Sequence, residues 1–216
     1  MRTERREQAA SPGRQHLLVS IAFSPVNRQG GDILQNVDDA HSSASADASS
    51  TSIVVEPLHA DAQFPRRATE GSAGYDLFAY LRGRRVRCSD GVEQWQVDTH
   101  TDEGASWLEL APGAMALVPL GFKARLPLGY EAQIRPRSGT TFKRGLQIPN
   151  APGTIDSDFP DEWMVLVRNP NAHPIRIDHG ERVAQMVLQR YEVLPFARGD
   201  VTISTDRAGG FGSTGR

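Results

Sequence analysis

Short apolar stretches separated by turn residues constrain the fold of this chain more than any other feature. The stretches that read as strands are Ile53–Val55, Met115–Leu120, Tyr130–Ile134, Trp163–Val167, Ile175–Ile177 and Val183–Tyr191. The turn signals are Pro112-Gly113, Pro127-Leu128-Gly129, Pro152-Gly153 and His179-Gly180. Many short strands with regular turns and almost no helical period are typical of all-β architectures. We therefore predict an all-β fold, a jelly-roll-like distorted β-barrel.

One segment departs from the strand pattern and predicts a single short helix. Apolar and polar residues alternate in Tyr130–Ile134, which indicates a half-buried strand. Pro136 ends that strand, because proline cannot donate to the ladder. We expect Ser138 to be the helix N-cap and Gly145 to end the helix about two turns later. The start of this helix, with Arg137 and Ser138, is suited to an anion, although an ordinary strand-to-helix corner would have the same sequence.

Two acids stand one residue apart in the segment Gly153–Phe159. If Ile155 and Ser157 face one side of an extended chain, Asp156 and Asp158 face the other. Carboxylates on one face repel each other unless a cation or a proton lies between them. The pair is therefore either two solvated turn acids or a general base beside a second carboxylate near a bound cation.

The last stretch of the chain, Gly209–Gly215, consists of glycines, two hydroxyl side chains and Phe211. It has almost nothing to bury, and ordering it costs roughly 1–2 kcal/mol per residue. One interpretation is a disordered terminus. The other is an arm that orders over a ligand, with backbone N–H groups on phosphate oxygens and Phe211 stacked on a base.

The composition divides the chain into three predicted parts. Residues 1–52 read as a disordered N-terminal extension, because Ala40–Ser50 is polar, of low complexity and unable to build a core. Residues 53–195 hold the strands and form the β-barrel domain. Residues 196–216 form a flexible C-terminal arm.

A hairpin is predicted within the domain. Asp90-Gly91 lies between the alternating segments Arg84–Cys88 and Val92–Val97. An Asp-Gly pair between such segments favours a tight hairpin turn. We expect three arginines in this region to form a solvated face, and a role in binding a phosphate or a partner is less favoured: Arg82, Arg84 and Arg85.

Charge and cysteine content exclude several classes of protein. The formal net charge is −2, which argues against a general nucleic-acid or membrane-surface binder. No apolar run reaches the length of a membrane span. Cys88 is the only cysteine, so no internal disulfide can form. We expect a cytoplasmic protein. Organelle targeting by the N-terminal arginines is less favoured, because Glu4 and Glu7 break the acid-poor pattern of transit peptides.

Five short motifs stand in a fixed order along the chain. They are Ala73–Leu77, Pro136–Gly139, Asn150 with Gly153–Phe159, Gly180–Gln185, and Arg207 with Gly209–Gly215. In this order the sequence resembles the trimeric deoxyuridine triphosphate nucleotidohydrolases, the dUTPases. Any single motif would be weak, but five in order are specific. The resemblance covers about Ile53 to Gly215, and residues 81–107 interrupt it as an inserted hairpin.

The resemblance implies hydrolysis of dUTP to dUMP and pyrophosphate, by attack of water on the α-phosphorus. This reaction supplies dUMP for dTMP synthesis and limits incorporation of uracil into DNA. Asp156 matches the catalytic base, a role that requires it to lie within about 3 Å of the water. Mg²⁺ is the implied cofactor, bound mainly by phosphate oxygens, and Asp76 matches the residue that acts on its water shell. A homotrimer with shared active sites is also implied.

The resemblance also assigns the residues that bind dUTP. They are Arg137, Ser138, Gly139 and Gln185 for the α- and β-phosphates, Asn150, Gly153, Thr154 and Ile155 for uracil, Phe159 for the deoxyribose, Asp158 and Met164, and Arg207, Phe211, Gly212 and Ser213 on the arm. Three features depart from the family pattern. Pro160-Asp161 replaces the usual Arg-Gly between the aromatic residue and Glu162, which alters the turn after the catalytic strand. Phe159 replaces a tyrosine, which keeps the aromatic face and removes the phenol, and Arg207 is one residue closer than usual to the glycine pair.

Two alternatives fit the same fold. A dCTP deaminase-like enzyme would need a glutamate poised to deaminate cytosine, whereas the third motif carries Asp156. A regulatory module that binds dUTP without turnover would be expected to lack the base. Both alternatives are therefore less favoured than hydrolysis of dUTP.

Overall fold

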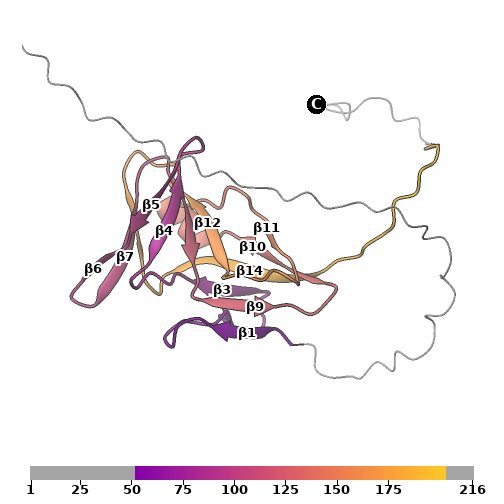
Figure 1. The fold of residues 1–216 in the computed structure, drawn as a ribbon, viewed down its shortest axis with the longest axis horizontal. Helices are drawn as coiled ribbons and strands as arrows, with labels where there is room; N and C mark the ends of the chain where they lie inside the picture. The colour runs from indigo at the N-terminus through magenta and orange to yellow at the C-terminus, as the bar shows by residue number, and fades with distance from the viewer. Residues whose placement is uncertain (1–51, 203–216) are drawn as a thin grey trace, which may run out of the picture. The chain divides into compact units, whose positions relative to one another are not determined.

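The computed structural model describes residues 52–202, and the regular secondary structure of this part of the chain is almost entirely short strands (Figure 1). The strands are β1 (Val54–Pro57), β2 (Arg66–Arg67), β3 (Gly74–Phe78), β4 (Arg85–Ser89), β5 (Gln94–Asp98), β6 (His100–Asp102), β7 (Ala105–Leu110), β8 (Met115–Pro119), β9 (Phe122–Arg125), β10 (Tyr130–Arg135), β11 (Gly153–Ile155), β12 (Met164–Arg168), β13 (Ile175–Asp178) and β14 (Arg182–Arg190). The helix is α1 (Ser138–Arg144). The all-β class and the single short helix are confirmed. The predicted extension, residues 1–52, lies outside the described residues apart from Ser52.

The strands pair into four antiparallel sheets. Their strand orders are β1-β9, β11-β10-β14-β3-β2, β12-β8-β4-β5 and β13-β7-β6. Within residues 52–202 no hydrogen-bonded ladder closes on itself. The predicted distorted barrel is therefore made of four separate sheets that share one core.

Alternation of apolar and polar residues turns each sheet toward that core. In β13, Ile175 and Ile177 are buried while Arg176 and Asp178 are exposed. Strand β12 buries Val165 and leaves its neighbours half-buried. Full burial of such a side chain contributes about 1.5–3 kcal/mol, so the repeated pattern fixes which face of each strand points inward. The largest fully buried side chains include Trp163, Phe122 and Leu77.

The five-stranded sheet brings three of the sequence motifs into register. Arg135 on β10 is paired with Gln185 on β14, and Gln185 is paired with Asp76 on β3. These residues lie far apart in the sequence but side by side in the sheet. The chain then leaves β10 through Pro136 and enters α1, which places residues 137–139 at the same end of the sheet.

The helix differs by one residue from the prediction. Ser138 is the first helical residue, and the N-cap is Arg137, whose extended backbone has φ −91° and ψ 130° and whose side chain forms no capping hydrogen bond. The Arg137 side chain is instead drawn to a buried carboxylate described below. The predicted end is confirmed, because Gly145 has φ 69° and donates its N–H to the Thr141 carbonyl.

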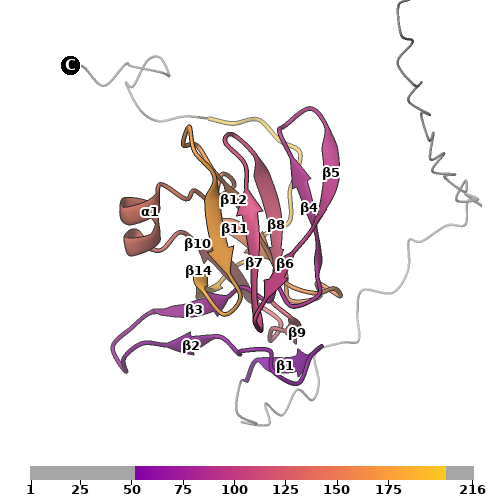
Figure 2. The same cartoon turned by 90° about the vertical axis from the view of Figure 1, so that its left-hand side faces the viewer.

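The predicted hairpin is confirmed, and its first strand also joins a neighbouring strand of the domain. β4 pairs with β5 across Asp90-Gly91, and Asp90 Oδ1 accepts the N–H groups of Val92 and Glu93 at 2.8 Å. β4 also pairs with β8 and buries Val86 and Cys88 in the core. This segment therefore belongs to a sheet of the domain. Figure 2 shows α1 and the β4–β5 hairpin on opposite sides of the domain.

The expectation of a solvated arginine face on this hairpin is wrong for Arg84. Arg82 and Arg85 form exposed ion pairs with Asp61 and Asp98, both at 2.9 Å. Arg84 is mostly covered and pairs with Glu162.

None of the helices among residues 52–202 is long and apolar enough to cross a bilayer.

Candidate active site

An arginine-rich cleft opens where β3, β10 and β14 meet the start of α1. Its volume is about 480 Å³. The residues that line it are Ala68, Ser72, Ala73, Gly74, Asp76, Arg135, Arg137, Ser138, Gly139, Gln185 and Val187. We call it the arginine cleft. It gathers the predicted phosphate-binding residues of the second and fourth motifs around Asp76 of the first.

Asp76 is the buried anion of the arginine cleft, with an exposed fraction of 8%. Its Oδ1 accepts a hydrogen bond from Nε of Arg137 at 2.7 Å, and its Oδ2 accepts one from Nη1 of Arg182 at 3.3 Å. The two guanidinium groups compensate the cost of burying this charge. Because the Arg137 contact uses only Nε, the other nitrogen atoms of that guanidinium can still bind an anion in the cleft.

Gln185 is fixed across the cleft by its neighbours. Its Nε2 donates to the carbonyl of Pro136 at 2.9 Å. Its Oε1 lies over Gly74, where a Cβ atom would approach to 2.2 Å. The side chain can take this position only because residue 74 is glycine. The glycine of the first motif therefore shapes the site through the glutamine of the fourth.

Ser138 and Gly139 present polar groups to the same cleft. Both residues are exposed and form the first turn of α1. The first N–H groups of a helix have no intrahelical acceptor, so those of residues 138 and 139 are free to bind a ligand. The Ser138 hydroxyl adds a further donor. This arrangement suits a polyanion.

A second group of candidates lies on the loop between β11 and β12. This loop, residues 156–162, carries Asp156, Asp158, Asp161 and Glu162, and we call it the acidic loop. Ile155 and Ser157 are half-buried while Asp156 and Asp158 are exposed, which confirms the predicted alternation. Among the described residues, the Asp156 carboxylate has no ion-pair partner. It is free to accept a proton from a bound water.

The turn before β11 places the predicted uracil-binding residues. The Ala151 N–H donates to the carbonyl of Ile148 at 3.0 Å, and the Ala151–Pro152 peptide bond is cis. Asn150 packs over Gly153, where a Cβ would approach its Nδ2 to 2.8 Å. β11 follows and pairs with β10 only, so Thr154 and Ile155 lie on an edge strand. The backbone beyond this edge is open to a ligand.

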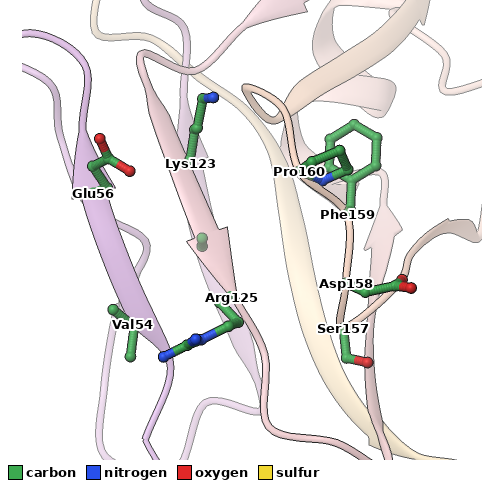
Figure 3. Close-up of a pocket in the computed structure, with 9 residues that line it drawn as sticks. Val54, Glu56, Lys123, Arg125, Ser157, Asp158, Phe159 and Pro160 are labelled. Carbon is green, nitrogen blue, oxygen red and sulfur yellow. The ribbon is translucent and has the colours of Figure 1, made fainter.

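A pocket of about 340 Å³ lies beside the acidic loop. Figure 3 shows Lys123 and Arg125 on β9, between β1 and the loop, with Asp158 and Phe159 on the loop. Met164, at the start of β12, lines neither this pocket nor the arginine cleft. The arm residues Arg207, Phe211, Gly212 and Ser213 lie outside the described residues.

Within one copy of the chain, Asp156 is far from the arginine cleft. β11 lies three strand spacings from β3, which places it about 14 Å from Asp76 at about 4.8 Å per spacing, and one spacing from Arg135 on β10. Ile155 pairs with Ala132, so Asp156 is level with residue 131, whereas the cleft is level with Arg135. Four residues add about 13 Å along the strands. A water held by Asp156 cannot reach a phosphate in the same copy's cleft.

The described residues fit a metal that arrives with its ligand. Within residues 52–202 no three acidic, histidine or cysteine side chains form a group that could hold a metal ion. Asp76 supplies a carboxylate to the arginine cleft, and its oxygens have capacity for further hydrogen bonds. Mg²⁺ keeps several waters and is usually bound through one or two carboxylates and substrate phosphates. Asp76 is suited to contact such a water.

Comparison with known proteins decides the family. The dUTPase family model matches residues 105–215. The chain is 41% identical over 152 residues to the deoxyuridine 5'-triphosphate nucleotidohydrolase of Roseobacter denitrificans, covering 70% of this chain and 86% of that protein. The chain belongs to the dUTPase family. The matched range contains the second to fifth motifs, and the first motif joins them in space through Asp76 and Gln185.

Solved dUTPase structures share the fold. A mutant of the dUTPase of phage 80alpha aligns with a TM-score of 0.58 and 21% identity, over 76% of this chain and 99% of that one. A mutant dUTPase of phage phi11 of S. aureus aligns with a TM-score of 0.53 and 18% identity, over 69% of this chain and 97% of that one. The latter structure is described as revealing the coordination of a structural Mg(II) ion.

Sequence reasoning missed several basic residues. Arg182 was part of the fourth motif but had no assigned role, and it is held against Asp76. Arg135 lines the cleft because it pairs with Gln185, a register that the sequence does not reveal. Lys123 and Arg125 alternate with buried residues on β9, a strand that was not predicted from the sequence. The i, i+2 spacing of the two cations was the only available signal.

Proposed function

We propose that this chain hydrolyses dUTP to dUMP and pyrophosphate. The observation that carries the proposal is the exposed carboxylate of Asp156 at the end of β11, in a chain that belongs to the dUTPase family. The buried Asp76 is already committed to two arginines, whereas Asp156 has no ion-pair partner among the described residues. Of these two acids, Asp156 is the one available to take a proton.

Asp156 acts as the general base. It accepts a proton from the water that attacks the α-phosphorus, which contributes typically 10²–10⁴-fold to the rate. The bond from the attacking oxygen to phosphorus forms as the bond to the bridging oxygen of the leaving pyrophosphate breaks. Because the carboxylate is at the end of a paired strand, its direction is set by the β10–β11 ladder.

The arginine cleft binds the phosphates. Arg137, Ser138 and Gly139 provide a guanidinium, a hydroxyl and backbone N–H groups, which are the donors that phosphate oxygens prefer. Gln185 adds its amide from the wall formed with Gly74. When bound, Mg²⁺ would neutralise charge on the triphosphate, and Asp76 is the residue that would face its water shell.

The turn at residues 150–155 selects the base, and Phe159 selects the sugar. Uracil presents a donor between two acceptors, which the open backbone of β11 and the Asn150 amide complement. Cytosine would leave buried groups unpaired. The Phe159 ring is 38% exposed, so its face is available to pack against C2′ of a deoxyribose. Asp158 and Met164 remain assigned to the substrate on the resemblance alone.

Each active site is built from more than one copy of the chain, in a homotrimer. The separation of Asp156 from its own arginine cleft supports this arrangement, because the two must meet around one phosphate. The segment after β14 also supports it. Val193, Leu194 and Phe196 there are 81%, 75% and 106% exposed. Apolar side chains so fully exposed are typical of surfaces that pack against another chain.

The C-terminal arm closes the site. Arg207 and Ser213 contact the γ-phosphate, Phe211 stacks on uracil, and Gly212 lets the backbone approach the phosphates. The division of the chain into residues 1–52, 53–195 with the insertion 81–107, and 196–216 is part of the same proposal. The cytoplasmic location stays a prediction from the sequence.

The decisive experiment incubates the protein and Mg²⁺ with dUTP, dTTP, dCTP or UTP and measures pyrophosphate and ammonia. We expect pyrophosphate from dUTP alone. Ammonia from dCTP would indicate a deaminase, and tight binding of dUTP without pyrophosphate would indicate a regulatory module. Either result would overturn the proposed function.

A further inference from the structure

The acidic loop is held at its two ends by different parts of the molecule. Asp156 follows β11, which is paired with β10. Glu162 precedes Trp163, which is buried and donates its N–H to the carbonyl of Phe122 at 3.0 Å. Residues 158–161 between them are exposed. The path of the loop therefore depends on how firmly each end is anchored.

The Glu162 carboxylate forms the far anchor. Its Oε1 accepts the N–H of Gly121 at 2.8 Å, and its Oε2 accepts Nη2 of Arg84 at 2.5 Å. The exposed fractions of the two side chains are 11% for Glu162 and 20% for Arg84. A pair this well covered is much less screened by salt than a surface pair. The second guanidinium nitrogen of Arg84, Nη1, lies 2.9 Å from Nε2 of His59.

Arg84 is itself fixed at the base of the β4–β5 hairpin. Its N–H donates to Thr99 Oγ1 at 3.2 Å, and its carbonyl accepts both the N–H and the hydroxyl of Thr99 at 2.9 and 3.0 Å. The backbone of the arginine thus cannot shift without breaking the hairpin. Its side chain, which is paired with Glu162, therefore holds that carboxylate in a fixed position relative to the hairpin.

We propose that Arg84 is a positioning residue for the reaction: through Glu162 it fixes the end of the acidic loop opposite the catalytic carboxylate. This inference rests on the proposed function and assigns a role to the segment 81–107 within it. Arg84 itself touches neither the cleft nor the pocket beside the loop.

Removal of the Arg84 guanidinium leaves Glu162 covered and without a cation. Such a carboxylate is strongly destabilised and turns toward solvent. The exposed centre of the loop then loses its fixed path, which displaces Phe159. The Phe159 N–H donates to the Asp156 carbonyl at 3.3 Å, so the turn that begins at Asp156 is loosened as well. Displacement of reacting groups by about 1 Å can cost up to about 10²-fold in rate. Displacement of Phe159 weakens the exclusion of a ribose hydroxyl.

The first test measures amide hydrogen exchange without nucleotide. Arg84→Met keeps the aliphatic stem and removes the charge, and Arg84→Lys keeps the charge. We expect amides of residues 157–163 to exchange at least about 10-fold faster in Arg84→Met, with partial recovery in Arg84→Lys. The matched control is Arg85→Met, the next residue, which breaks an exposed pair with Asp98. It should leave the acidic loop unchanged.

The second test measures kcat and KM for dUTP and UTP. Arg84→Met and Glu162→Gln should each lower kcat for dUTP by about 10-fold or more and lower the preference for dUTP over UTP. Partial unfolding would reduce the active fraction and lower both activities equally, leaving the ratio unchanged. A shifted ratio therefore separates loop positioning from stability.

The two tests fail in different ways. Unchanged exchange of the acidic loop in Arg84→Met, or an unchanged dUTP to UTP ratio, overturns the positioning role. A wild-type protein that does not hydrolyse dUTP overturns the proposed function. In that case hydrogen exchange still decides whether Arg84 anchors the loop.

Discussion

The arginine cleft and the acidic loop hold their carboxylates in opposite ways. Asp76 is buried on β3 of the five-stranded sheet and forms ion pairs with Arg137 and Arg182. Asp156 is exposed at the start of a loop and has no ion-pair partner among residues 52–202. A carboxylate fixed by two cations orients its partners, whereas a free carboxylate can take a proton. The proposed function makes the two regions complementary halves of one site, although they lie apart in a single copy.

The largest expected loss of activity comes from a substitution in the acidic loop. Asp156→Asn should lower kcat for dUTP by about 10³-fold, because the amide cannot act as a base. Pyrophosphate release measures the loss. Asp161→Asn, an exposed acid on the same loop, is the matched control and should retain activity. Activity of Asp156→Asn within a factor of about ten of wild type would remove Asp156 as the base.

A substitution in the arginine cleft should lower activity less than the loss of Asp156. Arg137→Ala removes a charged hydrogen bond to the phosphates and the pairing of Asp76, and such bonds contribute about 1.5–3 kcal/mol. We expect kcat/KM for dUTP to fall by about 10²-fold. The control is Arg135→Ala, which lines the same cleft but bonds to Gln133. Equal losses in both variants would show that total cleft charge, and not the Arg137 contact, matters.

Mixing the two inactive variants tests whether the halves come from different copies. Asp156→Asn and Arg137→Ala are unfolded together in equal amounts and refolded. A site that takes its base from one copy and its cleft from another is intact in about one quarter of random combinations, so about a quarter of wild-type activity should return. If both halves come from one copy, no activity returns. A mixture of the folded variants without refolding is the control.

A smaller effect is expected at the wall of the cleft. Gly74→Ala would bring a Cβ to 2.2 Å from Gln185 Oε1, so the glutamine must swing away. Because the obstructing atom ends a flexible side chain, the fold should persist while KM for dUTP rises by about 10-fold, the cost of one lost hydrogen bond. Gly71→Ala, with open space around its Cβ, is the control. An unchanged KM would exclude a role of Gln185 in binding.

The smallest expected effect is on the free energy of unfolding, through His179, which belongs to neither the arginine cleft nor the acidic loop. Burial, and then the nearby Arg82, lower the pKa of His179 below its usual value of about 6.5, while Asp61 opposes them. The unfolded chain therefore binds this proton more readily, so the free energy of unfolding should decrease as the pH falls below about 6.5. Urea denaturation at pH 7.5 and 5.5 should show a weaker pH dependence in His179→Gln. The exposed His173→Gln is the control, and equal slopes in all three proteins would contradict the prediction.

The sequence predicted the elements that a local pattern determines. Alternation located β10 and β12, an apolar stretch located β14, the Asp90-Gly91 pair located the β4–β5 turn, and Gly145 marked the end of α1. Strands as short as β2 and β6 carry no alternation that could be recognised. The four separate sheets depend on pairings between distant strands, which no local pattern specifies.

The site was predicted as a set of residues, and its geometry was not. Arg137 and Asp76 are 61 positions apart, and Arg84 and Glu162 are 78 apart. Burial drives both pairings, because a carboxylate removed from water must find a cation. Which cation it finds depends on sheet register. For that reason Arg84 was predicted to be solvated and is instead committed to the acidic loop.

The engagement of Arg84 with Glu162 limits how this protein can be shortened. Deleting residues 81–107 would remove β4, whose Val86 and Cys88 belong to the core, and would also strip Glu162 of its counterion. A minimal variant would need a neutral residue at 162 and an apolar cover over β8.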